Sequence, residues 1–118
     1  MYKKVVVMGG QMKLLSRSEE IMLLAIWKLK KEAYGVPIRE LVSDWTGQEW
    51  AFGQVYKPLK SLLGKNFVRQ YTTAPTSERG GRSKHIYELT TAGCEALSEI
   101  RKVQNNIWTD DSINAFEK

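Results

Sequence analysis

Residues 37–63 read PIRELVSDWTGQEWAFGQVYKPLKSLL, and this stretch decides the fold. Its first part, residues 37–46, places proline in a first helical turn and then repeats apolar residues at helical spacing. The same spacing returns over residues 52–65, and Gly47 lies between the two segments. Two short amphipathic helices joined by a tight connection predict a helix-turn-helix.

A longer helix is predicted before this stretch, over residues 17–32. It is apolar on nearly all sides, which is typical of a helix in the middle of a fold or in a subunit contact. Ser16 and Glu19 have the spacing of a capping box at its start, and Gly35 suits the left-handed position after its end. Pro58 leaves two alternatives for the third helix: it begins beside this proline, or its first turn is bent.

Two strand-like segments follow, at 67–72 and 84–89. The polar, glycine-rich residues 74–82 between them predict the tip of a hairpin. The second segment alternates, so Ile86 and Tyr87 are expected on opposite faces. The predicted fold is therefore mainly α with a small β-hairpin, that is, a winged helix-turn-helix.

The last helix is expected to start at Thr90 or Thr91, because both are good N-caps. Its apolar residues form a narrow stripe, too thin for a deep core but suited to a seam against another helix. These residues are Leu97, Ile100, Val103 and Ile107, with Trp108 beside them. We therefore predict a C-terminal dimerisation helix and a homodimer. Trp108 either packs against the partner subunit or stacks a planar effector in the interface.

The charge of the chain is unevenly distributed. The 118 residues carry a net charge of +5, and the whole excess lies in residues 51–90, which hold seven basic and two acidic side chains. A local basic excess indicates a polyanion partner, most simply nucleic acid, and a solvated basic face is the alternative. The single cysteine excludes an internal disulfide and favours the cytoplasm. The apolar segment 5–8 is too short to be a signal sequence or a membrane span, so no membrane partner is expected.

Catalytic chemistry is not expected from this sequence. His85 and Cys94 could in principle form a base and a nucleophile, but no third group is available to orient them, so structural roles are favoured. One histidine and one cysteine offer no metal-ligand spacing. We therefore predict neither an enzyme, nor a cofactor, nor a metal site.

Four sequence blocks in order resemble one family. They are LLAIW at 23–27, AYGVPIR at 33–39, GQVYKPLKSL at 53–62 and ERGGRSKHIYELTTAG at 78–93. Together they resemble the PadR family of bacterial transcriptional regulators over most of the chain, roughly residues 15–97. The resemblance implies a cytoplasmic dimeric repressor whose third helix enters a DNA major groove while its wing lies along the backbone. It also implies a C-terminal helix that packs on the partner subunit and, in some members, a small aromatic effector bound near the dimer interface.

The chain departs from the family pattern at three places. Ala51 occupies a position where a capping Ser or Thr is common, Pro58 lies one place later than the usual proline, and the N-terminal arm is extra. The domain organisation predicted from these blocks is an arm over 1–14, a winged helix-turn-helix over 15–90 and a dimerisation helix over 91–118.

The predicted contacts to double-stranded DNA fall on the third helix and the wing. Polar side chains in the first turns of a recognition helix reach base edges, and basic residues beside glycines clamp phosphates. The residues are Gln54, Tyr56, Lys57, Lys60, Arg79, Arg82 and Lys84. Tyr56 could instead belong to the core, and the wing tip could be a plain hairpin turn. The alternative function is a winged-helix protein-interaction module that does not bind DNA.

Overall fold

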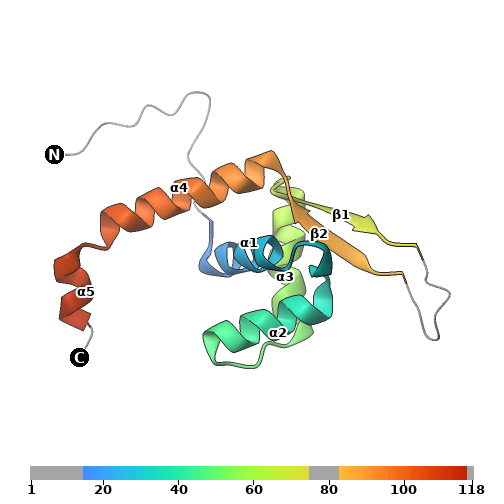
Figure 1. Cartoon of the computed structure of the whole chain (residues 1–118), viewed down its shortest axis with the longest axis horizontal. Coiled ribbons are helices and arrows are strands. Elements are labelled where there is room, and N and C mark those ends of the chain that lie inside the picture. The colour runs from blue at the N-terminus through green and yellow to red at the C-terminus, as the bar shows by residue number, and fades with distance from the viewer. Residues whose placement is uncertain (1–14, 75–82, 117–118) are drawn as a thin grey trace.

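The computed structural model describes residues 15–74 and 83–116. Its elements follow one another as α1 (Arg17–Leu29), a 3₁₀ turn (Lys30–Glu32), α2 (Gly35–Thr46), α3 (Phe52–Gly64), β1 (Val68–Thr72), β2 (His85–Leu89), α4 (Thr91–Ile107) and α5 (Asp110–Phe116). Figure 1 shows α1, α2 and α3 as one cluster, with the hairpin projecting from one side and α4 and α5 from the other. This arrangement confirms the winged helix-turn-helix with an additional C-terminal helix.

Helix α1 lies at the centre of the molecule and contacts α2, α3, β2 and α4. Its inner face supplies much of the core, in which each fully buried aliphatic side chain contributes about 1.5–3 kcal/mol. The fully buried members of the core include Met22, Leu23, Ile26, Ile38, Val42, Val55, Leu59, Leu62 and Val68. The outer face of α1 is not covered by the described residues, since Leu24 is 40% exposed and Trp27 is 57% exposed.

The start of α1 confirms the predicted capping box. The Ser16 N–H donates to Glu19 Oε1 at 2.9 Å, and the Glu19 N–H donates to Ser16 Oγ at 3.1 Å. The end of α1 differs from the prediction, since the α-helix stops at Leu29 and a 3₁₀ turn continues to Glu32. Gly35 was wrongly expected to close this helix.

Gly35 is instead the first residue of α2, and its φ is not positive. A Cβ at this position would lie 2.5 Å from the Tyr56 hydroxyl oxygen, so the glycine is required by a close approach and not by a left-handed turn. At its other end, α2 stops where predicted, because Gly47 adopts the left-handed conformation with φ 68°.

Helix α3 runs without interruption from Phe52, so Pro58 lies inside it. Of the two alternatives, a start beside the proline is wrong. Pro58 is buried with Val55 and Leu59 against the rest of the core. The proline lacks the N–H that would bond the carbonyl of Gln54, and burial of its ring offsets part of that loss.

The hairpin is a two-stranded antiparallel sheet in which Val68 pairs with Leu89 and Thr72 pairs with His85. Ile86 and Tyr87 are both buried, so β2 is covered on both faces near its centre. The Tyr87 N–H donates to the carbonyl of Ala33 at 2.8 Å, which ties the strand to the segment before α2. The predicted hairpin tip and N-terminal arm lie largely or wholly outside the described residues.

Helix α4 starts after Thr90, as predicted, and the Thr90 side chain accepts from the Gly93 N–H. The Thr90 N–H donates to the carbonyl of Phe67 at 3.1 Å, and its hydroxyl donates to the carbonyl of Asn66 at 2.6 Å. A Cβ on Gly93 would lie 2.0 Å from the Phe67 oxygen. The base of the wing and the start of α4 are therefore packed backbone to backbone. None of the helices within the described ranges is long and apolar enough to cross a membrane.

Candidate nucleic-acid interface

The connection between α2 and α3 is held by side chains of α2. The Trp50 N–H donates to Ser43 Oγ at 3.0 Å, and its indole N–H donates to Thr46 Oγ1 at 2.8 Å. The Thr46 hydroxyl donates in turn to the carbonyl of Val42 at 2.8 Å. These bonds satisfy polar groups that a tight turn would otherwise leave open, and they fix where α3 begins.

Arg39 also holds this turn, a role that was not predicted from the sequence. Its guanidinium donates to the carbonyl of Trp50 and, at 3.1 Å, to Glu49 Oε1. The guanidinium also lies 4.8 Å from the centre of the Phe52 ring. A basic residue on the second helix with an acid and two aromatics some ten positions later is the signal that could have indicated this clamp.

The first turn of α3 uses an unusual cap. Ala51 occupies the N-cap position and has no side-chain acceptor, but its N–H donates to Gln54 Oε1 at 2.8 Å. The Gln54 oxygen is therefore engaged within the helix, while its amide Nε2 forms no bond to another described residue. Of the two groups with which glutamine pairs with adenine, only the donor is free in this conformation.

Lys57 and Lys60 are exposed on α3. Among residues 15–74 and 83–116, neither lysine forms an ion pair or a side-chain hydrogen bond. Basic side chains without partners, one turn apart on the second helix of a helix-turn-helix, are typical of nucleic-acid-binding surfaces.

Tyr56 is partly exposed and partly packed, so neither of the two interpretations from the sequence is complete. The residue is 46% exposed, and its ring stacks on Phe52 with a centroid separation of 6.2 Å. Its hydroxyl end reaches Gly35 at the start of α2. Burial, with the neighbouring Tyr56 as a smaller cause, raises the pKa of Tyr87 above its usual value. Tyr87 therefore stays protonated at neutral pH.

The described part of the wing places Lys84 beside α2 and α3. Its N–H donates to Thr73 Oγ1 at 2.9 Å, and its ammonium lies 4.5 Å from the centre of the Tyr34 ring. Lys84 and Tyr56 line one cavity of about 200 Å³. The wing and the third helix therefore present adjacent surfaces. Arg79 and Arg82 lie outside the described residues.

Two other cations of the basic region are engaged in ion pairs. Arg69 pairs with Glu88 across the hairpin. Lys65 donates to Glu19 Oε2 at 2.6 Å, and Glu19 is 5% exposed. Between residues 51 and 90, the described lysines and arginines without an ion-pair partner are Lys57, Lys60 and Lys84, which were all predicted to contact DNA. The Lys84 ammonium also donates to the Tyr34 hydroxyl at 3.5 Å.

The Glu19 carboxylate joins the start of α1 to the end of α3. Burial alone would raise its pKa, but hydrogen bonds from Lys65, from the Ser16 N–H and from the Ser61 hydroxyl outweigh burial. Together with the charge of Lys65 they lower the pKa of Glu19 from 4.5 to about 2. The Glu19 carboxylate therefore stays ionised at neutral pH. Its bonds to Ser61 and Lys65 hold the end of α3 against the start of α1.

The predicted seam of α4 divides into two parts. Leu97 and Ile100 are half-buried and pack against the core of their own chain, so the stripe is not wholly free for a partner. Beyond them, Ile107 is 65% exposed and Trp108 is 48% exposed. Val103 lies between the two parts and is half-buried. The exposed end of α4 and the exposed face of α1 are apolar surfaces that residues 15–74 and 83–116 leave uncovered.

No hydrogen bond joins His85 to Cys94 in the described part of the chain. His85 Nδ1 lies 3.3 Å from Thr72 Oγ1, and Cys94 is exposed in the first turns of α4. Within the described part of the chain, neither has a charged hydrogen-bond partner.

Comparison with known proteins identifies the same fold. The family model described as "Transcriptional regulator PadR-like family" matches residues 23–99. A PadR family transcription regulator from hypervirulent Clostridium difficile R20291 is 28% identical, with a TM-score of 0.60, over 81% of this chain and 96% of that one. The smu.1704 protein from Streptococcus mutans UA159 is 23% identical, with a TM-score of 0.62, over 90% and 95%. RosR of H. salinarum is 21% identical, with a TM-score of 0.61, over 81% and 79%. No curated protein matches the sequence.

Proposed function

The chain belongs to the PadR-like family of DNA-binding transcriptional regulators, and we propose that it acts as a homodimeric repressor. In this proposal α3 enters the major groove of an operator while the wing follows the backbone. Occupation of the operator blocks transcription, and a small aromatic effector releases the protein. The proposal places the protein in the cytoplasm.

One observation supports the proposal that α3 and the wing form the DNA-binding face. Lys57, Lys60 and Lys84 lie on α3 and on the adjacent wing, and none has an ion-pair partner among the described residues. Lysine groups that neutralise phosphates release counterions and so drive association with DNA. The Arg39 clamp supports the same role, because a recognition helix must be held in position before it reads bases.

The proposed homodimer uses apolar surfaces that the described part of one chain leaves exposed. Ile107 and Trp108 at the end of α4, and Leu24 and Trp27 on α1, are large exposed apolar side chains. Exposed apolar groups of this size on two elements are typical of a subunit interface. Two-fold pairing would present two α3 helices to the two halves of an operator.

The effector part of the proposal rests on Trp108. Its ring meets Phe116 of α5 edge to face, with a centroid separation of 6.3 Å, and one face of such a pair can accept a further aromatic ring. The alternative is that Trp108 packs against the partner subunit and binds no effector. Quenching of tryptophan fluorescence by a planar aromatic compound, absent in Trp108→Ala, supports the effector role. Quenching that is the same in both proteins opposes it.

The rival function is a winged-helix protein-interaction module without DNA binding. Such a module needs no lysines without ion-pair partners on α3 and the wing, so the charge distribution favours the DNA-binding regulator. Titration of generic duplex DNA at two salt concentrations separates the two. A regulator binds with an affinity that falls steeply with salt, whereas an interaction module does not bind.

Two groups of variants test the face residue by residue. Lys84→Ala should weaken operator and random DNA about equally and reduce the slope of log K against log salt by about 1 per lost phosphate contact, or about 2 in a dimer. Arg82→Ala should behave in the same way. Gln54→Ala should instead cost about 1–3 kcal/mol on the operator and leave random DNA nearly unchanged.

Gln54→Ala also removes the acceptor for the Ala51 N–H, so the test needs a matched control. Gln54→Glu keeps that acceptor and removes the free amide donor. If Gln54→Glu binds the operator as well as the wild type, Gln54 acts only as a cap. If Lys84→Ala changes neither affinity nor slope, the wing does not clamp phosphates.

A further inference from the structure

The start of α3 carries an exposed aromatic pair that lies outside the buried core. Phe52 is 45% exposed and Tyr56 is 46% exposed, and their rings stack on each other. The guanidinium of Arg39 lies 4.8 Å from the centre of the Phe52 ring, and the same guanidinium is bonded to the carbonyl of Trp50. The Phe52 ring is therefore held in one position although nearly half of the residue is exposed.

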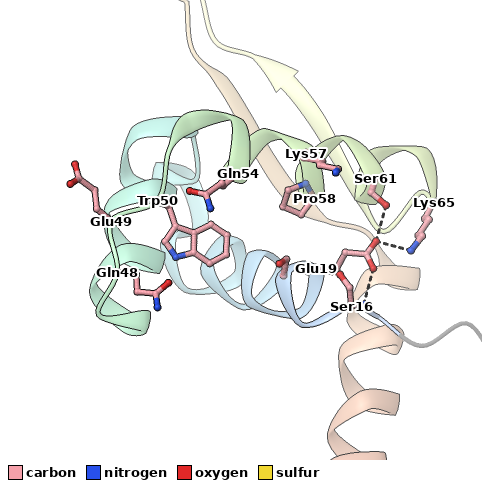
Figure 2. Close-up of a pocket in the computed structure, with 11 residues that line it drawn as sticks. Ser16, Glu19, Gln48, Glu49, Trp50, Gln54, Lys57, Pro58, Ser61 and Lys65 are labelled. Atoms are coloured by element: carbon pink, nitrogen blue, oxygen red, sulfur yellow. Dashed lines mark hydrogen bonds and ion pairs between the residues drawn. The ribbon is translucent and has the colours of Figure 1, made fainter.

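The exposed surface of α3 has two sides. Gln54 and Lys57 lie on the side that borders a groove toward the start of α1, and Figure 2 shows them apart from each other along the helix. Phe52 and Tyr56 do not line that groove, and Tyr56 lies on the side toward Lys84 and the wing. One side is therefore polar and basic, whereas the other is aromatic.

Gly53 lies between the two sides, and nothing within residues 15–74 and 83–116 requires a glycine there. Its φ is not positive, and no atom lies within 4 Å of a Cβ built on it. Glycine within a helix is less favourable than alanine, and it is used where another molecule must approach the backbone closely. Gly53 therefore leaves a gap beside the Phe52 ring that is open to a partner.

The surroundings of this gap indicate the chemistry of the partner. Lys57 and Lys60 follow on the same helix without ion-pair partners among the described residues, so their charge favours a polyanion. The gap itself is bordered by an apolar ring, which favours a small apolar group. In the major groove of DNA only thymine presents a methyl group, and phenylalanine is one of the side chains suited to contact it.

We propose that Phe52 and Gly53 read the methyl group of thymine, so that the first turn of α3 selects thymine by apolar contact rather than by hydrogen bonding. The Phe52 ring covers one side of the methyl group, and the missing side chain of Gly53 lets the base edge approach. The inference rests on the proposed DNA-binding function. It adds to that function a base preference that phosphate contacts cannot supply.

The probes for this preference are two alternating duplexes, poly(dA-dT) and poly(dA-dU). Both carry the same charge and the same hydrogen-bonding groups in the major groove, and they differ in the thymine methyl group. Every register of the first duplex presents thymine. Competition measured by fluorescence anisotropy at one salt concentration should give wild type an affinity for poly(dA-dT) about fourfold higher per buried methyl group, or about 15-fold higher in a dimer.

Phe52→Ala should bind the two duplexes about equally, because the apolar surface is lost. Phe116→Ala is the matched control and should keep the wild-type preference, since Phe116 is an exposed phenylalanine of α5. A preference that persists in Phe52→Ala would come from the shape or stiffness of the duplex and would overturn the proposal. Loss of the preference in both variants would overturn it as well.

Gly53→Ala tests the gap without removing the ring. The new Cβ meets no atom of the described structure, so this variant should be at least as stable as wild type in urea denaturation. It should nevertheless lose the preference for poly(dA-dT), because its methyl group occupies the space of the thymine methyl. Gly64→Ala, near the end of the same helix, is equally unobstructed and should keep the preference.

The glycine variant keeps the proposal open to refutation even if Phe52→Ala does not fold. Equal binding of the two duplexes by wild type, or an unchanged preference in Gly53→Ala, would overturn the reading of thymine. Unfolding of Gly53→Ala would also overturn it, because the gap would then be filled by the protein itself. Failure of the proposed function has a different signature, since wild type would then bind neither duplex.

Discussion

Glu19 is a buried carboxylate that three groups keep ionised: the Lys65 ammonium, the Ser61 hydroxyl and the Ser16 N–H. Hydrogen bonds to charged groups contribute more than neutral ones, and an unpaired buried partner is costly. A single side chain therefore connects the start of α1 to the last turn and the C-cap of α3.

Glu19→Gln should lower the free energy of unfolding by about 1–3 kcal/mol at pH 7, because it removes the charge that Lys65 and Ser61 bind. Urea denaturation measures the change. Glu95→Gln is the matched control, since Glu95 is exposed and should lose little. Equal losses in the two variants would show that the buried network adds no stability.

The same carboxylate predicts a pH dependence with a defined sign. Its pKa is lowered on folding from 4.5 to about 2, so its contribution is fully present above about 4.5 and is lost as the pH falls toward 2. The difference in unfolding free energy between wild type and Glu19→Gln should therefore shrink over this window. A difference that stays constant from pH 6 to pH 2.5 would contradict the lowered pKa.

At this scale the sequence predicted local partners and missed distant ones. The bond between Ser16 and Glu19 follows from their spacing on one helical turn. The bond from Lys65 to Glu19 joins residues 46 positions apart, and no spacing rule brings such residues together. Gly35 shows the same limit. A glycine after a helix usually marks its end, but here the reason is the Tyr56 hydroxyl from another helix.

At the scale of elements, Gly93 fixes the wing against α4. Gly93→Ala should destabilise the protein by about 1–3 kcal/mol, because the new Cβ meets the backbone oxygen of Phe67, which cannot move aside easily. Urea denaturation gives the change. Gly64→Ala is the control, since no atom lies within 4 Å of a Cβ there, and it should be neutral or stabilising by up to about 1 kcal/mol. A Gly93→Ala variant as stable as Gly64→Ala would show that α4 is not tightly packed against the Phe67 backbone.

The order of the elements was predictable because each has its own periodicity or cap. The start of α4 at Thr90 and the end of α2 at Gly47 were both correct. The division of α4 was not predictable from its stripe. Leu97 and Ile100 have a spacing like that of Ile107, yet the first two pack on their own core while Ile107 is 65% exposed. The start of α1 meets α4 at Gln104, whose amide donates to Glu20, and Ile107 lies beyond this contact.

At the scale of the whole molecule, this division allows a clean test of assembly. Ile107→Glu should give folded monomers, because Ile107 is 65% exposed within one chain and is buried only in the proposed homodimer. Sedimentation velocity at tens of micromolar measures the mass, and circular dichroism confirms the fold. Ile100→Glu should instead lower the melting temperature, since Ile100 packs on its own core. Wild type that sediments as a monomer would refute the dimer.

Because the wing is packed rigidly against α4, this C-terminal helix determines the distance between the two recognition helices in the proposed homodimer. Since α3, the wing and the start of α4 are packed together through Phe67, Thr90 and Gly93, the separation of the two recognition helices is set by where along α4 the subunits meet. One residue inserted in the middle of α4 would turn everything beyond it by about 100° and advance it by about 1.5 Å. The preferred half-site spacing, about 34 Å for one turn of DNA, would then shift although no residue that touches DNA had changed.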